Sequence, residues 1–404
     1  MREHFQKRKS SEGGIAHAIR PFHISTGYFH FRIYCYTSFM RGIGILEINE
    51  QAAQIPNCIR FDKGSAKFSF PEELLPLIDE VKKDITDRYF GYPVTGGENV
   101  LKERIATVEQ KNGRDVSSKD IVITHGGMSG ISSVLGAITK PGDEVITNKY
   151  FFEGFSLAIE HFKLQHRTVD FTDIEALKRA ITPKTRAIIL NSPENPTGKV
   201  YTPEEVSRIE TVAQNAGIYL LSDEVTNEIL YGGTRWMGPS LDGARTVAIN
   251  SFSKNWFIPG IRVGWTVSKD RGLNKSIADF LSAQSAGVNL FGQLLMAHAL
   301  ERINYTQFVA KRLNILTARR DTMKKALKAK GIQYLQEPGG SMNFYVDLRN
   351  DSKEIASRLL ADGTVAIIPG EFFEGKTSHY ARIGFGAVKE EEIIRGIDMI
   401  AGLL

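Results

Sequence analysis

The 404-residue chain has only two cysteines, Cys35 and Cys58. Two cysteines cannot build a disulfide framework or a four-ligand structural zinc site, so we expect no metal site and a cytoplasmic location. No run of about 18 apolar residues is present, which argues against a membrane-spanning helix. Hydrophobic residues nevertheless make up 42% of the chain, which excludes disorder over most of its length.

Excess positive charge is scarce outside the first 39 residues. Residues 1–39 hold six basic and two acidic side chains, a net charge of +4, whereas the whole chain carries +5. The remaining 365 residues therefore carry only +1, and we expect no nucleic-acid binding by them. The first segment has no sustained helical or strand period, so we predict a disordered basic extension. A nucleic-acid-binding arm is the alternative for this segment.

From residue 60 onward, short apolar runs alternate with segments of helical pattern. The apolar runs predict buried strands at 121–124, 144–147, 187–190, 218–221 and 246–249. Helices are predicted at 130–138, 174–181 and 203–216. This alternation is typical of an α/β domain with a mostly parallel sheet covered by helices on both faces.

The pattern changes after about residue 290. A long helix is predicted at 308–330, then a strand at 344–347, a helix at 352–362 and a strand at 364–368. We interpret this part as a smaller α/β domain. The predicted division is an extension at 1–39, an N-terminal arm with part of the small domain at 40–85, a large domain at 86–288 and the small domain at 289–404.

Chemically useful side chains follow the predicted strands, where ligands bind in open α/β sheets. A glycine-rich turn at 125–130 precedes a helix, which suits a phosphate. Asn195 lies in a loop fixed by prolines, and Asp223 ends an apolar strand, where an acid needs a cation. Lys254 follows the last strand, with Arg262 eight residues later. Each feature alone is also explained by an ordinary turn or surface side chain.

Together, these features resemble a known family. The matching motifs are Asn195-Pro196-Thr197-Gly198, Ser222-Asp223-Glu224-Val225, Ser251-Phe252-Ser253-Lys254 and Arg262. Their order and spacing resemble those of fold-type-I pyridoxal-phosphate enzymes, and the chain is similar to class I/II aminotransferases of the aspartate and aromatic type from about Ile45 onward. The resemblance implies pyridoxal 5′-phosphate as cofactor. It also implies amino transfer from an L-amino acid to a 2-oxo acid in two half-reactions, through a Schiff base on Lys254.

The resemblance also implies roles for cofactor-binding residues. Lys254 would bind the cofactor aldehyde and move the substrate α-proton, and Asp223 would pair with the pyridine nitrogen. Asn195 would donate to the phenolic oxygen, and Phe151 would stack on the ring, with Tyr150 as the alternative. The phosphate would be held by the Gly127 and Met128 amides, the Ser251 hydroxyl and the Arg262 guanidinium, with Ser253 a weaker candidate.

Three further residues receive roles toward substrate and partner. Arg382 resembles the arginine that clamps the substrate α-carboxylate, and Gly64 lies where backbone approaches the substrate. Tyr92 resembles a tyrosine lent to the neighbouring subunit's phosphate. The resemblance therefore implies a homodimer with shared active sites.

The sequence departs from the family pattern at two places. Thr226 replaces a usual tyrosine, so we expect the Lys254–cofactor linkage to keep its proton to higher pH. Lys67 lies in an altered substrate loop, where it could meet an acidic side chain or simply be solvated. Two other functions stay open: a pyridoxal-phosphate-dependent β-lyase on the same fold, and a cofactor-binding regulator with a DNA-binding head.

Overall fold

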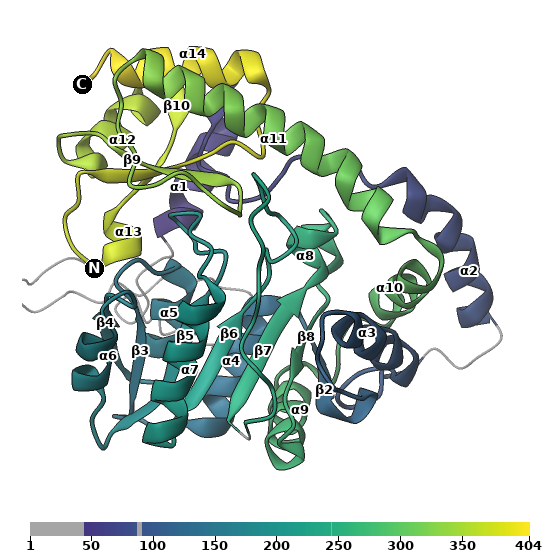
Figure 1. Ribbon diagram of the computed structural model, residues 1–404. Helices are drawn as coiled ribbons and strands as arrows, with labels where there is room; N and C mark the ends of the chain where they lie inside the picture. Colours follow the sequence, from purple (N-terminus) through teal and green to yellow (C-terminus); the bar gives the residue numbers. More distant parts are fainter. Residues whose placement is uncertain (1–43, 87–90, 244) are drawn as a thin grey trace, which may run out of the picture. The chain divides into compact units, whose positions relative to one another are not determined.

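The computed structural model describes residues 44–86, 91–243 and 245–404 (Figure 1). The extension predicted at 1–39, with Cys35, lies outside these residues, and the domain limits drawn from the sequence stay predictions. Cys58 is buried. Within the described ranges, no helix is long and apolar enough to cross a bilayer.

The large sheet has seven strands in the order β2-β8-β7-β6-β5-β3-β4. Their bounds are β2 Ile121–Thr124, β3 Glu144–Asn148, β4 Gln165–Val169, β5 Thr185–Asn191, β6 Tyr219–Asp223, β7 Thr246–Ser251 and β8 Gly264–Val267. β8 runs antiparallel to its neighbours β2 and β7, whereas all the other pairs in this sheet are parallel. The predicted mostly parallel sheet is confirmed.

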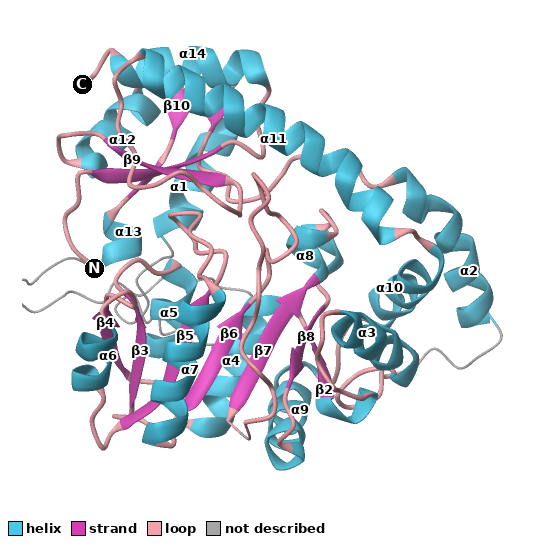
Figure 2. Cartoon of the chain, in the orientation of Figure 1, coloured by secondary structure: helices cyan, strands magenta, loops and turns pink. Residues whose placement is uncertain are grey.

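Helices cover both faces of this sheet because its strands are apolar on both sides (Figure 2). Ala187 and Ile189 of β5 pack in a cluster with α4, α5 and α9, whereas Ile188 and Leu190 pack in another with α6 and α7. The helices of this part are α3 Asn99–Lys111, α4 Gly127–Ile138, α5 Glu153–His161, α6 Ile174–Ala180, α7 Pro203–Ala216, α8 Phe252–Asn255 and α9 Arg271–Ser285, with single turns at Ser118–Asp120 and Pro259–Ile261.

Helix α7 begins and ends where its sequence predicts. The Thr202 hydroxyl accepts from the Glu205 amide, and the Glu205 carboxylate accepts in turn from the Thr202 amide. Gly217 ends the helix with a left-handed conformation at φ 64°. The predicted range 203–216 is therefore confirmed.

Two small sheets lie outside the seven-stranded sheet and are formed by segments near the two ends of the described chain. The first pairs β1 with β10, and the second has the order β11-β12-β9. Their bounds are β1 Ile59–Arg60, β9 Asn343–Asp347, β10 Val365–Ala366, β11 Ile368–Pro369 and β12 Tyr380–Gly384. The helices here are α1 Gly44–Gln54, α2 Leu75–Thr86, α10 Leu290–Arg302, α11 Tyr305–Ala329, α12 Ser352–Ala361, α13 Glu371–Glu374 and α14 Glu390–Ala401, with a turn at Glu72–Leu74.

The strand predicted at 364–368 is wrong as a single element. Val365 pairs with Ile59 of β1, whereas Ile368 pairs with Arg382 of β12. The chain changes sheets at Ile367, so the continuous apolar run serves two sheets. This change brings Arg382 into register beside β11.

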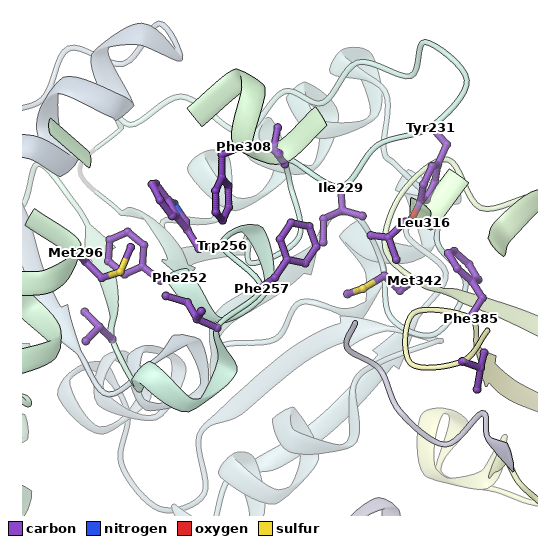
Figure 3. Close-up of a cluster of buried hydrophobic side chains, with 14 of the residues drawn as sticks. Ile229, Tyr231, Phe252, Trp256, Phe257, Met296, Phe308, Leu316, Met342 and Phe385 are labelled. Carbon is purple, nitrogen blue, oxygen red and sulfur yellow. The ribbon is translucent and has the colours of Figure 1, made fainter. Parts of the chain in front are cut away.

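The largest apolar cluster fixes the short helix that carries Lys254 (Figure 3). Phe252 and Trp256 lie on either side of that lysine in the chain and are buried. The Trp256 ring packs 4.9 Å from that of Phe308, on α11. Large buried rings stabilise a segment far more than the few hydrogen bonds of a four-residue helix.

Candidate active site

The sheet places three predicted residues at neighbouring strand ends. Asn195 follows β5, Asp223 ends β6, and Lys254 lies in α8 directly after β7. Since these strands are adjacent and parallel, their carboxyl ends meet at one edge. Arg382 comes from β12.

Lys254 is the amine of this group. Its Nζ donates to the Gly64 carbonyl oxygen at 2.8 Å. Burial lowers the pKa of Lys254 to about 8, and the positive charges of Arg382 and Arg262 act in the same direction, whereas Asp223 opposes them. A substantial neutral fraction at neutral pH makes this amine a usable nucleophile and base.

Asp223 is a buried carboxylate that accepts a hydrogen bond from the Val225 amide at 3.3 Å. Burial raises the pKa of Asp223 to about 7, and the charge of Glu224 adds to this, whereas Lys254 lowers it. No salt bridge to Asp223 is found in the described part of the chain. Such an acid gains most from a bound cation, and a protonated pyridine nitrogen fits that need.

Arg382 is a buried cation that faces neutral partners. Its Nη2 donates to the Asp62 carbonyl oxygen at 2.7 Å, and its Nη1 donates to Asn195 Oδ1 at 3.2 Å. The guanidinium lies 5.1 Å from the ring centre of Phe373, and Nε is buried without a hydrogen-bond partner. Burial lowers the pKa of Arg382 to about 10. A planar guanidinium held in this way suits a carboxylate.

Asn195 is oriented from both sides. Its backbone amide donates to Asn191 Oδ1 at 2.8 Å, and Asn191 Nδ2 donates to the Asp223 carbonyl oxygen at 3.2 Å. Because Oδ1 of Asn195 accepts from Arg382, its Nδ2 group is left as a donor. Asn195 is thereby linked to both Asp223 and Arg382.

The glycine-rich turn lies against Arg262, which donates to the His125 carbonyl oxygen at 2.8 Å. Gly126 has φ 93°, and a Cβ there would lie 2.8 Å from Arg262 Nη2. Gly127 begins α4, and a Cβ there would lie 2.7 Å from Val225 Cγ1. The turn therefore requires glycine, and its free helix amides beside a guanidinium suit a phosphate.

The remaining cofactor-binding candidates are less directly placed. Arg262 Nη1 lies 3.4 Å from the Ser253 hydroxyl. Arg262 therefore contacts Ser253, which was the weaker candidate from the sequence, and not Ser251. Ser251 is buried, and Met128 is half-buried in α4. Phe151 is buried, and its ring packs edge-to-face with that of His166, with ring centres 4.6 Å apart.

Four other residues named from the sequence lie apart from these contacts. Tyr150 packs against Tyr345, with ring centres 5.6 Å apart. Tyr92 is 88% exposed, and Lys67 is exposed. Thr226 is buried, and its hydroxyl donates to the Pro193 carbonyl oxygen at 3.4 Å.

Residues that the sequence reasoning did not single out complete the site. The Asp62 carbonyl and the Phe373 ring hold Arg382, and Asn191 holds Asn195. Asp62 is itself fully buried and paired with Arg60 at 2.7 Å. The only sequence signal for these residues was that they lie near the loops that carry the predicted site residues.

Glu224, the neighbour of Asp223, has a separate structural partner. Both acids are buried. Arg114 donates to both Glu224 oxygens, at 2.6 and 2.8 Å, and to Glu109 at 2.8 Å. Burial raises the pKa of Glu224, whereas Arg114 opposes that shift.

We expect Arg114→Ala to lower the free energy of unfolding by about 3–5 kcal/mol, because it leaves two carboxylates buried without their cation. Urea unfolding measures this loss. The control is Arg104→Ala, whose ion pair with Glu301 is exposed on both sides and should contribute about 1 kcal/mol or less. Equal losses of unfolding free energy in the two variants would contradict the expected contribution of the buried Arg114 ion pairs to stability.

Comparisons with known proteins identify the family of the chain. The family model described as aminotransferase class I and II matches residues 57–400. The aspartate aminotransferase of Streptomyces avermitilis is 26% identical over 372 residues, covering 86% of this chain and 89% of that protein. The (5-formylfuran-3-yl)methyl phosphate transaminase of Methanocaldococcus jannaschii is 28% identical over 349 residues, covering 86% and 91%.

Solved structures show the same fold. The Thermus thermophilus aspartate aminotransferase with maleate matches with a TM-score of 0.83 and 25% identity, covering 90% of this chain and 97% of that one. The fold type expected from the sequence is therefore confirmed. Since the family model covers most of the chain, the chain belongs to the class I and II aminotransferases, whose members depend on pyridoxal 5′-phosphate.

Proposed function

We propose that this aminotransferase carries out its reaction at the site formed by Lys254, Asp223, Asn195 and Arg382. One observation carries the proposal: the Lys254 amine bonds to the Gly64 carbonyl, and the Gly64 backbone packs on Arg382. A Cβ on Gly64 would lie 3.1 Å from Arg382 Nη1. An amine and a carboxylate-binding cation thus flank one segment, as an α-amino acid requires.

Each residue has a role that its contacts support. Pyridoxal phosphate, when bound, supplies an electron-accepting ring that stabilises negative charge at the substrate Cα. Asp223 would hold the ring nitrogen, and Arg262 with the amides of Gly127 and Met128 would hold the phosphate. Lys254 would carry the cofactor and then move the proton of the substrate Cα as base and acid.

Phe151, Ser251 and Asn195 would complete the cofactor site. Phe151 would cover the ring, Ser251 would add a hydroxyl to the phosphate group, and Asn195 Nδ2 would donate to the phenolic oxygen. Arg382 would bind the substrate α-carboxylate. No observation favours the β-lyase or the regulator, and the relatives named above are transaminases.

Aspartate is the donor to test first, because relatives named aspartate aminotransferase match most of the chain. The local charge also suits an anionic substrate. Burial lowers the pKa of Lys254, and the nearby charge of Arg382 lowers it further. Burial also lowers the pKa of Lys63, where Asp62 opposes the shift and Arg382 adds to it.

We also propose a homodimer with Tyr92 reaching the partner's phosphate. The Tyr92 side chain is 88% exposed and Val94, two residues later, is 60% exposed. Exposed apolar side chains of this size are common at subunit interfaces. The scarcity of cysteine keeps the cytoplasm as the proposed location.

A donor and acceptor screen tests the proposal. The holoenzyme is mixed with single L-amino acids while the visible cofactor band is followed, and a 2-oxo acid is then added to restore it. Borohydride reduction and peptide mass analysis of the resting enzyme should locate the cofactor on Lys254. A modified lysine elsewhere, or no band change with any donor, would overturn the assignment. Repeated turnover of a cysteine conjugate to pyruvate, ammonia and a thiol, without a 2-oxo acid, would indicate the lyase.

The rate of cofactor binding to the apoenzyme should rise with pH with a midpoint near 8, since burial lowers the pKa of Lys254 to about 8. Only the neutral amine attacks an aldehyde, and its fraction grows as the pH passes the pKa. Stopped-flow absorbance measures this rate, with Nα-acetyllysine as the reference amine. In Arg382→Gln the midpoint should move upward, because a cation that disfavours protonated Lys254 is gone. If the binding rate rose only near the ordinary pKa of lysine, the result would contradict the effect of burial on Lys254.

A further inference from the structure

A buried carboxylate lies directly beside Asn195. Glu194 is 2% exposed, although it belongs to a loop between β5 and α7. Its side chain accepts from Tyr201 at 2.9 Å, from Thr197 at 2.5 Å and from Asn148 at 2.5 Å. Three donors on one buried acid form a satisfied polar cluster, which fixes side-chain geometry more firmly than apolar packing.

The cluster joins two segments that carry cofactor-binding candidates. Asn148 is the last residue of β3, three residues before Phe151, and its Oδ1 accepts from the Phe171 amide at 3.0 Å. Glu194 immediately precedes Asn195. The Glu194 carboxylate therefore connects the loop that carries Asn195 to the end of β3, close to Phe151.

The loop is also closed by its own backbone around Glu194. The Glu194 amide donates to the Lys199 carbonyl oxygen at 2.7 Å, and the Gly198 amide donates to the Glu194 carbonyl oxygen at 2.8 Å. The nearby cation Lys199 pairs with Glu205 at 2.8 Å instead of with Glu194. The acid is therefore held by neutral donors, a costly arrangement when stability alone is served.

We propose that Glu194 is a positioning residue that sets the separation of Asn195 from Phe151, and so the seating of the cofactor ring between them. The proposal rests on the proposed function, because it takes Asn195 and Phe151 as ring contacts. Glu194 itself touches neither the cofactor nor the substrate in this scheme. Its effect should appear in cofactor properties before it appears in folding.

The test compares Glu194→Ala with Glu194→Gln in the holoenzyme. In Glu194→Ala, cofactor dissociation should speed up about tenfold, and the pH midpoint of the visible band should rise by about 0.5–1 unit, as expected for one misplaced hydrogen bond. Glu194→Gln keeps an acceptor for Asn148 and Tyr201 and a donor for Thr197, so both quantities should stay within about twofold or about 0.3 unit of wild type.

Glu144→Ala is the matched control. Glu144 begins β3 and is also buried, at 6% exposed against 2% for Glu194. It accepts from Thr182 at 2.5 Å, from Thr185 at 3.3 Å and from Arg167 at 3.0 Å. It lies at the opposite end of the same strand, away from Asn195. This variant should lose stability but keep the wild-type dissociation rate and band midpoint.

Asn148→Ala covers the case in which Glu194→Ala does not fold. Asn148→Ala keeps the acid but removes its link to β3, together with the acceptor of the Phe171 amide. It should change both cofactor properties in the same direction by a smaller amount. Wild-type values in Glu194→Ala or Asn148→Ala would overturn the proposal, as would equal cofactor changes in Glu144→Ala. Failure of the proposed function would show separately, as a wild-type enzyme without a Lys254 adduct.

Discussion

Replacing Lys254 with alanine is expected to lower kcat for amino transfer by about 10⁴-fold, the upper range for loss of a positioned acid–base group. The substitution removes the amine held at the Gly64 carbonyl, and with it the group that would move the substrate α-proton. A donor–acceptor assay with excess cofactor measures the remaining rate, since excess cofactor separates lost chemistry from weakened binding.

Two other lysine variants make this result specific. Lys254→Arg keeps a positive charge but cannot release a proton near neutral pH, so it should be as inactive as the alanine variant. Lys67→Ala removes an exposed lysine from the loop after Gly64 and should stay within about threefold of wild type. If Lys254→Ala kept more than about one tenth of the wild-type kcat, Lys254 would not be the acid–base group.

The sequence predicted the centre of the large sheet well, for a physical reason. β2, β3 and β7 are buried throughout, so each has a run of apolar residues at its centre, such as Val145-Ile146 in β3. β4 escaped prediction because it forms a sheet edge and contains polar residues such as Gln165 and Arg167. The sequence also did not predict β8, which pairs with both β2 and β7.

The candidate site was predictable in its membership but not in its connections. Motifs point to Asn195, Asp223 and Lys254, and the structure places these residues at the ends of neighbouring strands. Contacts between distant segments leave no local pattern, and Arg382 meets the Asp62 carbonyl across 320 residues. The sequence also did not reveal that Glu194 is buried, because an acid among prolines is usually a surface turn residue.

Replacing Arg382 with alanine should lower kcat/KM for amino acids by about 10²–10³-fold, the usual consequence of removing one partner of a buried ion pair. The loss should fall mainly on KM, because a carboxylate is bound in the ground state and the transition state alike. Arg382→Lys should recover only part of it. A lysine keeps the charge but cannot donate in parallel to both carboxylate oxygens while bonding to Asp62 and Asn195.

A donor without an α-carboxylate separates binding from folding. The wild-type enzyme should strongly prefer an amino acid over the corresponding primary amine, and Arg382→Ala should abolish most of this preference while leaving the slow amine reaction unchanged. If Arg382 served only to hold Asn195 and the Asp62 segment in place, both donors would lose rate equally. Because the guanidinium is buried among neutral acceptors and an aromatic ring, its removal should not lower the free energy of unfolding as the loss of Arg114 does. A preference for amino acids that survives in Arg382→Ala would place the substrate carboxylate elsewhere.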